Sequence, residues 1–219
     1  MIGILREPEF FGARLTMDEA HKLLGEIFSA AGRSLANAVE KLGYPNGNRN
    51  AVIPENNLLV HVAKELIHRD FDLFCEAALS DEKEKLPPRR IDLIAARHDF
   101  AVAFEFKRRP RPDQVLTDLQ RLHDFVVKPS CRVDGQTRSS YSTAAHALGV
   151  FVTTSYGVNE QTWLALSNRD DELSERWYPV RDFVIGHQAQ VKRTDAFWKQ
   201  DEHFARTGEL RLAWLAFDK

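Results

Sequence analysis

The stretch RRIDLIAARHDFAVAFEFK, Arg89 to Lys107, contains two apolar runs separated by a short polar segment. Both runs are typical of β-strands, and His98 and Asp99 between them are the expected turn. The second run, AVAFEFK, is apolar except for Glu105 and the lysine that ends it. Because an isolated carboxylate is costly to bury, the position of Glu105 needs a chemical explanation.

A tight antiparallel connection at this turn pairs Asp92 with Glu105 and Arg90 with Lys107. Directly opposed residues share a sheet face, with Cβ atoms ~4.5–5.5 Å apart. Lys107 lies two residues beyond Glu105 and so projects from the same face. A one-residue slip would break this arrangement. The other face is expected to be an apolar core surface made of Ile91, Leu93, Val102, Phe104 and Phe106.

Two carboxylates this close repel each other and raise one pKa unless a positive charge lies between them. A divalent cation such as Mg²⁺ favours oxygen ligands and usually binds only a few carboxylates. With Asp92 and Glu105 as ligands, Lys107 could orient and help deprotonate a water molecule and stabilise negative charge on a phosphate. The alternative interpretation is an ion-pair ladder on a half-exposed sheet.

These residues resemble the core of the PD-(D/E)XK nucleases, which have the restriction-endonuclease-like fold. That pattern has an Asp on one strand and an (Asp/Glu)-x-Lys on the next, and Asp92, Glu105 and Lys107 match it. Ile91 stands where the family's name has proline, which many members also lack. The resemblance implies that the three matching residues are catalytic, and that the carbonyl of Phe106 is a further metal ligand.

The resemblance also implies further residues around the site. Many members place a metal-binding Glu on the helix before the first strand, where Glu55 is the first choice and Glu65 the reserve. Either could instead be an ordinary helix charge. Candidate nucleic-acid-binding residues, each of which could also be structural or solvated, are Arg108, Arg109, Arg111 and Gln120.

The order of the expected elements is helix, helix, three strands, helix and strand, followed by mixed elements. This order predicts an α/β or α+β domain with a central mixed sheet flanked by helices. Thr16 and Glu19 form a capping box at the start of the first helix. The later elements include a helix at about 158–168. The single domain, residues 1–219, is expected to comprise a helical extension 1–53, the nuclease-like core 54–155 and a mixed extension 156–219.

Composition and charge limit the classes of protein. Hydrophobic residues make up 43% and charged residues 28%, as in ordinary globular domains, and a net charge of −2 argues against a general nucleic-acid coat. Residues 85–138, however, carry twelve Lys or Arg against seven Asp or Glu, and this local excess could attract a polyanion.

Location is predicted from equally simple features. The beginning MIGILREPEFF is a poor signal peptide, because Arg6 and Glu7 interrupt its apolar start. No apolar run approaches the ~18 residues of a membrane span. Cys75 and Cys131 form no metal or redox spacing. We therefore expect a cytoplasmic protein with no membrane partner.

The leading hypothesis is a Mg²⁺- or Mn²⁺-dependent phosphodiesterase that cuts DNA, with RNA as the second choice of substrate. A homodimer would provide the two sites that cutting both strands requires. One alternative is a non-catalytic nucleic-acid-binding or scaffold module that retains the fold. Another is a retaining glycosidase, because a carboxylate pair at ~5 Å fits that chemistry, although Lys107 would then have no role.

Overall fold

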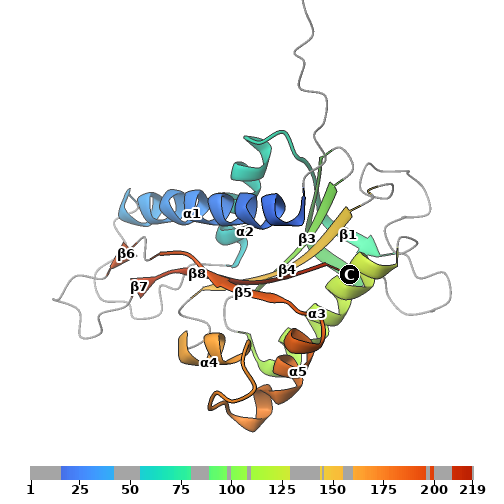
Figure 1. Cartoon of the computed structure of the whole chain (residues 1–219). Coiled ribbons are helices and arrows are strands. Elements are labelled where there is room, and N and C mark those ends of the chain that lie inside the picture. The colour runs from blue at the N-terminus through green and yellow to red at the C-terminus, as the bar shows by residue number, and fades with distance from the viewer. Residues whose placement is uncertain are drawn as a thin grey trace, which may run out of the picture.

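A computed structural model of the chain contains a six-stranded mixed sheet with helices on both faces (Figure 1). No helix among the residues it describes combines the length and the apolar character needed to cross a membrane. The described residues are 16–41, 55–79, 89–97, 100–107, 110–128, 144, 146–154, 160–195, 198–199 and 209–218.

The helices are α1 (Met17–Lys41), α2 (Glu55–Ile67), α3 (Pro112–Val127), α4 (Glu160–Ala165), the short 3-10 helix η3 (Glu175–Trp177) and α5 (Tyr178–Gly186). The strands are β1 (Asp72–Leu79), β2 (Arg89–Arg97), β3 (Phe100–Lys107), β4 (His146–Thr154), β5 (Gln190–Arg193), β6 (Trp198–Lys199), β7 (Glu209–Leu210) and β8 (Leu212–Phe217). The sheet order is β1-β2-β3-β4-β8-β5, and β6 pairs with β7 separately. Only the β3–β4 pair of the six-stranded sheet is parallel.

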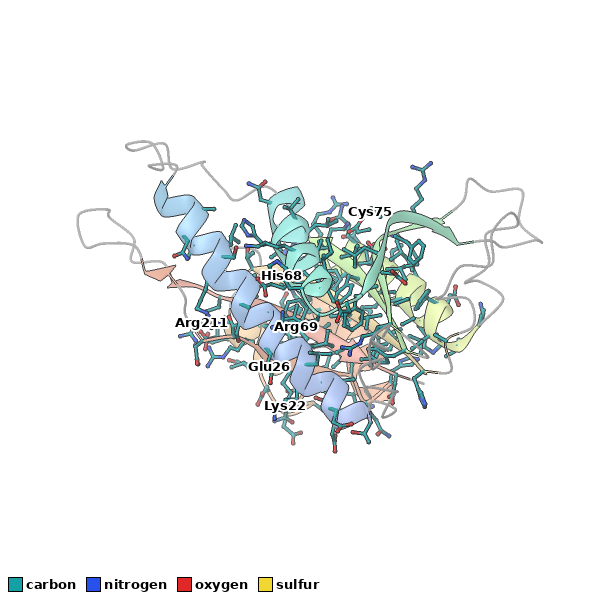
Figure 2. The ribbon with its side chains drawn as sticks, turned by 90° about the horizontal axis from the view of Figure 1, so that it is seen from above. Lys22, Glu26, His68, Arg69, Cys75 and Arg211 are labelled. Atoms are coloured by element: carbon teal, nitrogen blue, oxygen red, sulfur yellow. The ribbon has the colours of Figure 1, made fainter. Side chains whose placement is uncertain are left out.

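The predicted capping box at the start of α1 is confirmed. The Thr16 N–H donates to Glu19 Oε2 at 2.8 Å, and the Glu19 N–H donates to Thr16 Oγ1 at 3.3 Å. These bonds satisfy backbone donors that have no partner inside the helix. Lys22 and Glu26 lie on the outward side of α1 (Figure 2), so the apolar side of the helix is left to pack on the sheet.

Buried apolar side chains form two layers, one on each face of the sheet. The upper layer lies under α1 and α2 and includes Phe28, Val62 and Phe104. The lower layer packs against α3, α4 and α5 and includes Leu122 and Phe151. Figure 1 shows α1 and α2 on one side of the sheet and α3, α4 and α5 on the opposite side. Strand β4 is buried at every residue after its first, as its place between β3 and β8 and the helices on both faces require.

Helix α3 connects the parallel strands β3 and β4 and lies close against the sheet. Gly149 on β4 allows this approach, since a Cβ there would lie 3.0 Å from Leu122 Cβ and 2.8 Å from Phe217 Cζ. Both neighbours are themselves fully buried, so neither can move away freely. The position of α3 matters because this helix covers the face that carries Glu105.

We expect Gly149→Ala to lower the free energy of unfolding by ~1–3 kcal/mol, because overpacking displaces buried neighbours. Gly25→Ala is the matched control. A Cβ at Gly25 meets nothing within 4 Å, so alanine in this helix should raise stability by up to ~1 kcal/mol. Urea unfolding of both variants measures the difference, and equal midpoints would contradict the close approach of α3.

Two parts of the C-terminal region differ from the sequence-based expectation. The helix expected at about 158–168 ends earlier, since α4 stops at Ala165. Strand β5, QVKR, was not expected because it has only one apolar residue. It forms by pairing with β8, which means that a neighbouring strand, rather than its own pattern, determines its structure.

Candidate active site

The hairpin of β2 and β3 has the predicted register. Leu93 lies opposite Phe104, and the pairing continues to Arg97 opposite Phe100. The predicted pairs Asp92–Glu105 and Arg90–Lys107 lie just beyond the end of this ladder. The turn residues 98–99 lie outside the described part of the chain. This register places the acidic residues of the two strands at the open end of the hairpin.

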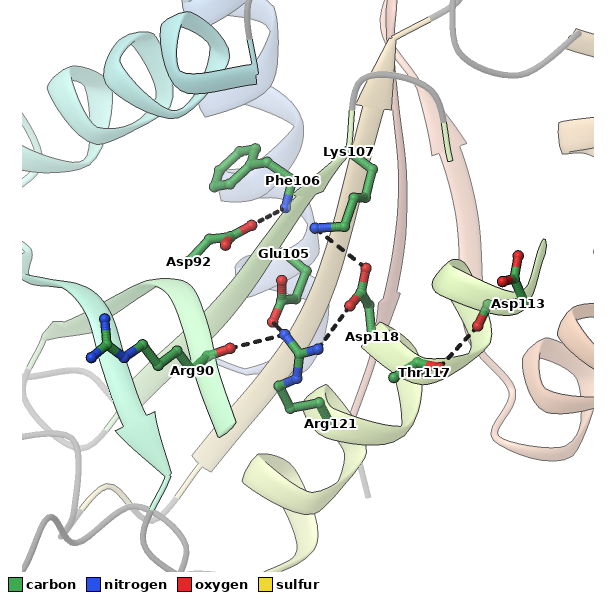
Figure 3. A network of polar contacts seen from close by, with 9 residues as sticks. All are labelled: Arg90, Asp92, Glu105, Phe106, Lys107, Asp113, Thr117, Asp118 and Arg121. Atoms are coloured by element: carbon green, nitrogen blue, oxygen red, sulfur yellow. Dashed lines mark hydrogen bonds and ion pairs between the residues drawn. The ribbon is translucent and has the colours of Figure 1, made fainter. Parts of the chain in front are cut away.

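Asp92 and Glu105 therefore approach each other from adjacent strands. Asp92 Oδ2 accepts a hydrogen bond of 2.8 Å from the N–H of Phe106 (Figure 3). This bond crosses from β2 to β3 and holds the half-buried Asp92 carboxylate beside the strand that carries Glu105. The negative charge of Asp92 is close enough to raise the pKa of Glu105.

The regular alternation of side chains along β2 is interrupted at Asp92. Leu93 packs in the layer under α1 and α2, whereas Ile91 packs in the layer on the α3 side. Residues two apart share a face in a regular strand, so the prediction that Ile91 lines the same face as Leu93 is wrong. The pairing with β1 keeps one register on both sides of Asp92, with Cys75 opposite Leu93 and Ala77 opposite Ile91, so no residue is inserted there. The change of layer coincides with the end of the β2–β3 ladder, where Asp92 Oδ2 accepts the bond from the Phe106 N–H.

Glu105 is completely buried, with 0% of its surface exposed. It faces α3. Ala101 and Ala103 lie four and two residues before it on β3 and therefore share its face, and both pack in the α3-side layer. Arg121 Nη1 on α3 donates a hydrogen bond of 2.5 Å to Glu105 Oε1. Glu105 Oε2 makes no hydrogen bond to any described residue. One oxygen of this carboxyl group is thus paired and the other is available to a ligand.

The surroundings of Glu105 favour its neutral form. Burial raises the pKa of Glu105 to about 9, and the charge of Asp92 is the second cause. The positive charges of Arg121 and Lys107 act in the opposite direction without offsetting these effects. An additional positive charge at the carboxyl group would restore its ionised form.

Lys107 lies at the edge of the same site and contacts α3. Its Nζ is 3.6 Å from Oδ2 of Asp118, whose side chain is only 4% exposed. Asp118 Oδ1 accepts a hydrogen bond of 3.0 Å from Arg121 Nη2. Burial raises the pKa of Asp118, while Lys107 and Arg121 lower it. Figure 3 shows Glu105, Lys107, Asp118 and Arg121 converging between β3 and α3.

Three buried oxygen atoms in this region make no hydrogen bond within the described part of the chain. They are Glu105 Oε2, Asp118 Oδ2 and Thr153 Oγ1. Thr153 lies directly opposite Lys107 in the parallel β3–β4 pair and is 0% exposed. Asp118 Oδ2 has an ionic partner in Lys107 Nζ at 3.6 Å. Buried polar atoms are nearly always satisfied, so the other two oxygens could bind a ligand or an ordered water.

Comparisons with models of protein families, with curated proteins and with solved structures found no match. The chemistry of the site therefore has to be inferred from its own residues. Among the described side chains, no group of three or more His, Cys, Asp and Glu could hold a metal. A cation with few protein ligands still fits, since Mg²⁺ usually takes one or two carboxylates and retains several waters. Asp92 and the unpaired oxygen of Glu105 could supply such ligands.

The two candidate ligands on α2 have different outcomes. Glu55 is the first residue of α2, but its side chain lies outside what the structure describes. Glu65 accepts a hydrogen bond of 2.9 Å from Arg69 on the same helix. Helix α2 covers the sheet face opposite α3, so the local pair with Arg69 accounts for Glu65 without a metal.

The candidate nucleic-acid-binding residues are only partly described. Arg108 and Arg109 lie outside the described residues. Arg111 precedes α3, is exposed and forms an ion pair of 3.1 Å with Asp113. Gln120 is exposed on α3, and its neighbours on the helix, rather than Gln120 itself, contact Glu105 and Lys107. Binding of nucleic acid by these residues stays a prediction.

Sequence reasoning missed Asp118 and Arg121. A signal was present, because Asp118 interrupts the apolar stripe of α3 formed by Val115, Leu119 and Leu122. A carboxylate on the buried side of a helix needs a charged or hydrogen-bonding partner. The sequence alone did not show that the partners would be Lys107 and Arg121.

Proposed function

We propose that this protein is a metal-dependent phosphodiesterase with a restriction-endonuclease-like core of the PD-(D/E)XK type. The observation that carries the proposal is the buried Glu105 carboxyl group, with one oxygen unpaired and Asp92 beside it. Lys107 follows two residues later on the same strand. A carboxylate pair of this kind is best explained by a divalent cation, and the adjacent lysine by an anionic substrate.

The residues would divide the work of phosphodiester hydrolysis. A divalent cation, Mg²⁺ or Mn²⁺, would neutralise the carboxylates, lower the pKa of a water molecule and stabilise charge on the phosphate. Asp92, Glu105 and the carbonyl of Phe106 would hold it. Lys107 would donate hydrogen bonds that orient the attacking water and stabilise the phosphate oxygens as the bond to the leaving oxygen breaks.

Asp118 and Lys107 form a contact that supports this role. The Lys107 ammonium group lies 3.6 Å from Asp118 Oδ2, and its side chain is 25% exposed. The lysine side chain is thus both held by α3 and partly exposed to solvent. A lysine that is positioned in this way can meet a phosphate with little further ordering of its side chain.

DNA is the proposed substrate, and RNA is the second choice. The segment 85–138 that contains the site has the local excess of Lys and Arg, twelve against seven acidic residues. Such an excess favours a polyanion near the site. A homodimer would allow both strands of a duplex to be cut, and it remains part of the proposal.

We expect the purified protein to cut double- or single-stranded DNA with Mg²⁺ or Mn²⁺ and to lose all cleavage in EDTA. Added Mn²⁺ should restore the activity, because the cation supplies chemistry that the side chains do not. The assay compares labelled single-stranded DNA, duplex DNA and RNA on gels. Cleavage that continues at full rate in EDTA would contradict the proposed metal dependence.

The second candidate function is a non-catalytic nucleic-acid-binding or scaffold module. The specific observation in its favour is the short hydrogen bond from Arg121 to Glu105. The positively charged guanidinium already lies next to the buried carboxyl group, so no cation is needed there. In such a module the polar network would be structural. Calorimetric titration with Mn²⁺ discriminates the two, since a module of this kind shows no metal binding and no cleavage.

A further inference from the structure

Arg121 binds one oxygen of the Glu105 carboxyl group, which is also a ligand of the proposed cation. Its guanidinium donates to Glu105 Oε1 at 2.5 Å, to the Arg90 carbonyl at 2.8 Å and to Asp118 Oδ1 at 3.0 Å. Its side chain is 21% exposed, whereas that of Glu105 is 0% exposed. The guanidinium of Arg121, a side chain of helix α3, thus provides the positive charge that contacts Glu105 (Figure 3).

We propose that Arg121 is an internal counter-ion that competes with the divalent cation for Glu105, and so sets how tightly the site binds metal. This inference rests on the proposed metal-dependent function. Without metal, Arg121 stabilises the buried carboxyl group. When a cation binds, Arg121 keeps its bonds to Asp118 and the Arg90 carbonyl but gives up part of its interaction with Glu105.

Coulomb's law gives the sign of the effect. A guanidinium close to the site repels a doubly charged cation about twice as strongly as it repels a proton. Removing Arg121 also makes Glu105 easier to protonate, which opposes metal binding. Because the gain for the dication is the larger of the two effects, the net result of removal is tighter binding of metal.

The same removal should destabilise the metal-free protein. Glu105 would lose its only hydrogen bond given by a described residue, and a buried polar group without a partner is costly. If the role of Arg121 were purely structural, its removal would lower stability and would weaken the metal affinity or leave it unchanged. Removal of the inferred counter-ion lowers stability but strengthens metal binding, and these opposite signs distinguish the two roles.

The test is calorimetric titration of Mn²⁺ into wild type and Arg121→Gln at mildly alkaline pH, with thermal melts in EDTA. We expect the variant to bind Mn²⁺ about tenfold more tightly, which corresponds to about 1.4 kcal/mol, and to melt at a lower temperature. Arg69→Gln is the matched control. Arg69 is 25% exposed and donates to Glu65 at 2.9 Å, and it lies at the end of α2 (Figure 2), so its loss should not change Mn²⁺ affinity.

Arg121→Lys provides a second variant that also serves if Arg121→Gln does not fold. Its single ammonium group cannot reproduce the fork that joins Glu105 and Asp118, so Mn²⁺ affinity should rise above that of wild type, by less than in Arg121→Gln. Unchanged or weaker binding in the folded Arg121 variants, or an equal gain in Arg69→Gln, would overturn the inference.

The outcome for wild type separates this inference from the proposed function. If wild type binds Mn²⁺ and cuts DNA but the Arg121 variants bind no more tightly, only the counter-ion role is wrong. If wild type fails to bind and an Arg121 variant binds, the counter-ion role is supported and the function of the wild-type site is wrong. If none of them binds Mn²⁺, both are wrong.

Discussion

Lys107→Ala is expected to reduce DNA cleavage by roughly 10³-fold while the fold and Mn²⁺ binding persist. The physical reason is that the Lys107 side chain is 25% exposed and, in the proposed mechanism, its ammonium group acts on the substrate while the carboxylates hold the cation. Asp118 keeps its hydrogen bond of 3.0 Å to Arg121 when Lys107 is removed. Asp118 Oδ2 loses its ion pair with Lys107, so some loss of stability is also expected, and turnover is therefore compared in samples that remain folded.

Single-turnover cleavage at saturating Mn²⁺, with calorimetric titration of the same samples, measures this separation. Lys22→Ala is the control, because Lys22 is exposed on the outward side of α1 (Figure 2). The Lys22→Ala substitution also removes one lysine charge, but from α1, which lies on the sheet face opposite α3. A Lys107→Ala protein that cuts DNA at the wild-type rate would show that the lysine has no part in the reaction.

Glu105→Gln should have two effects of opposite sign. It should weaken Mn²⁺ binding by roughly 100-fold, because the amide supplies no negative charge. It should also stabilise the metal-free protein at alkaline pH. The pKa of Glu105 is raised from 4.5 to about 9 in the folded state, so the folded protein holds a proton that the unfolded chain releases between these values. Wild-type stability therefore decreases as pH rises from 4.5 to about 9.

Urea unfolding in EDTA across this pH range tests the second effect. Glu105→Gln should remove most of the decrease, since glutamine does not titrate. Glu19→Gln is a control of opposite sign. The hydrogen bonds from Thr16 lower the pKa of Glu19, so this carboxylate stabilises the fold above its ordinary pKa, and its contribution is lost as pH falls. A Glu105→Gln profile that follows wild type would contradict the burial of a proton at this position.

The sequence predicted the hairpin well because its two strands follow simple physical rules. Alternation with a period of two, together with a tight turn, fixes the register, and Leu93 does lie opposite Phe104. The start of α1 was equally clear, since a capping box uses side chains only three residues apart, Thr16 and Glu19. Local chemistry of this kind needs no knowledge of the rest of the chain.

The remainder of the site depends on contacts between distant segments. The rotation of α3 on the sheet brings Arg121 to Glu105, sixteen residues away in the chain, and no local pattern determines that rotation. Ile91 packs in the α3-side layer, next to the residue whose side chain accepts the bond from the Phe106 N–H, and no local pattern indicates either contact. The alternation of apolar and polar residues predicts the register of the hairpin. It does not predict that Arg121 is the partner of the buried Glu105 carboxyl group.

The anomalous scattering of Mn²⁺ in crystals grown with this ion would locate the cation itself. A single strong peak within coordination distance of the carboxylates of Asp92 and Glu105, with Lys107 Nζ next to it, is the result we predict. No peak at these carboxylates at saturating Mn²⁺, with Arg121 still paired with Glu105, would mean that the buried network is structural and that the phosphodiesterase proposal is wrong.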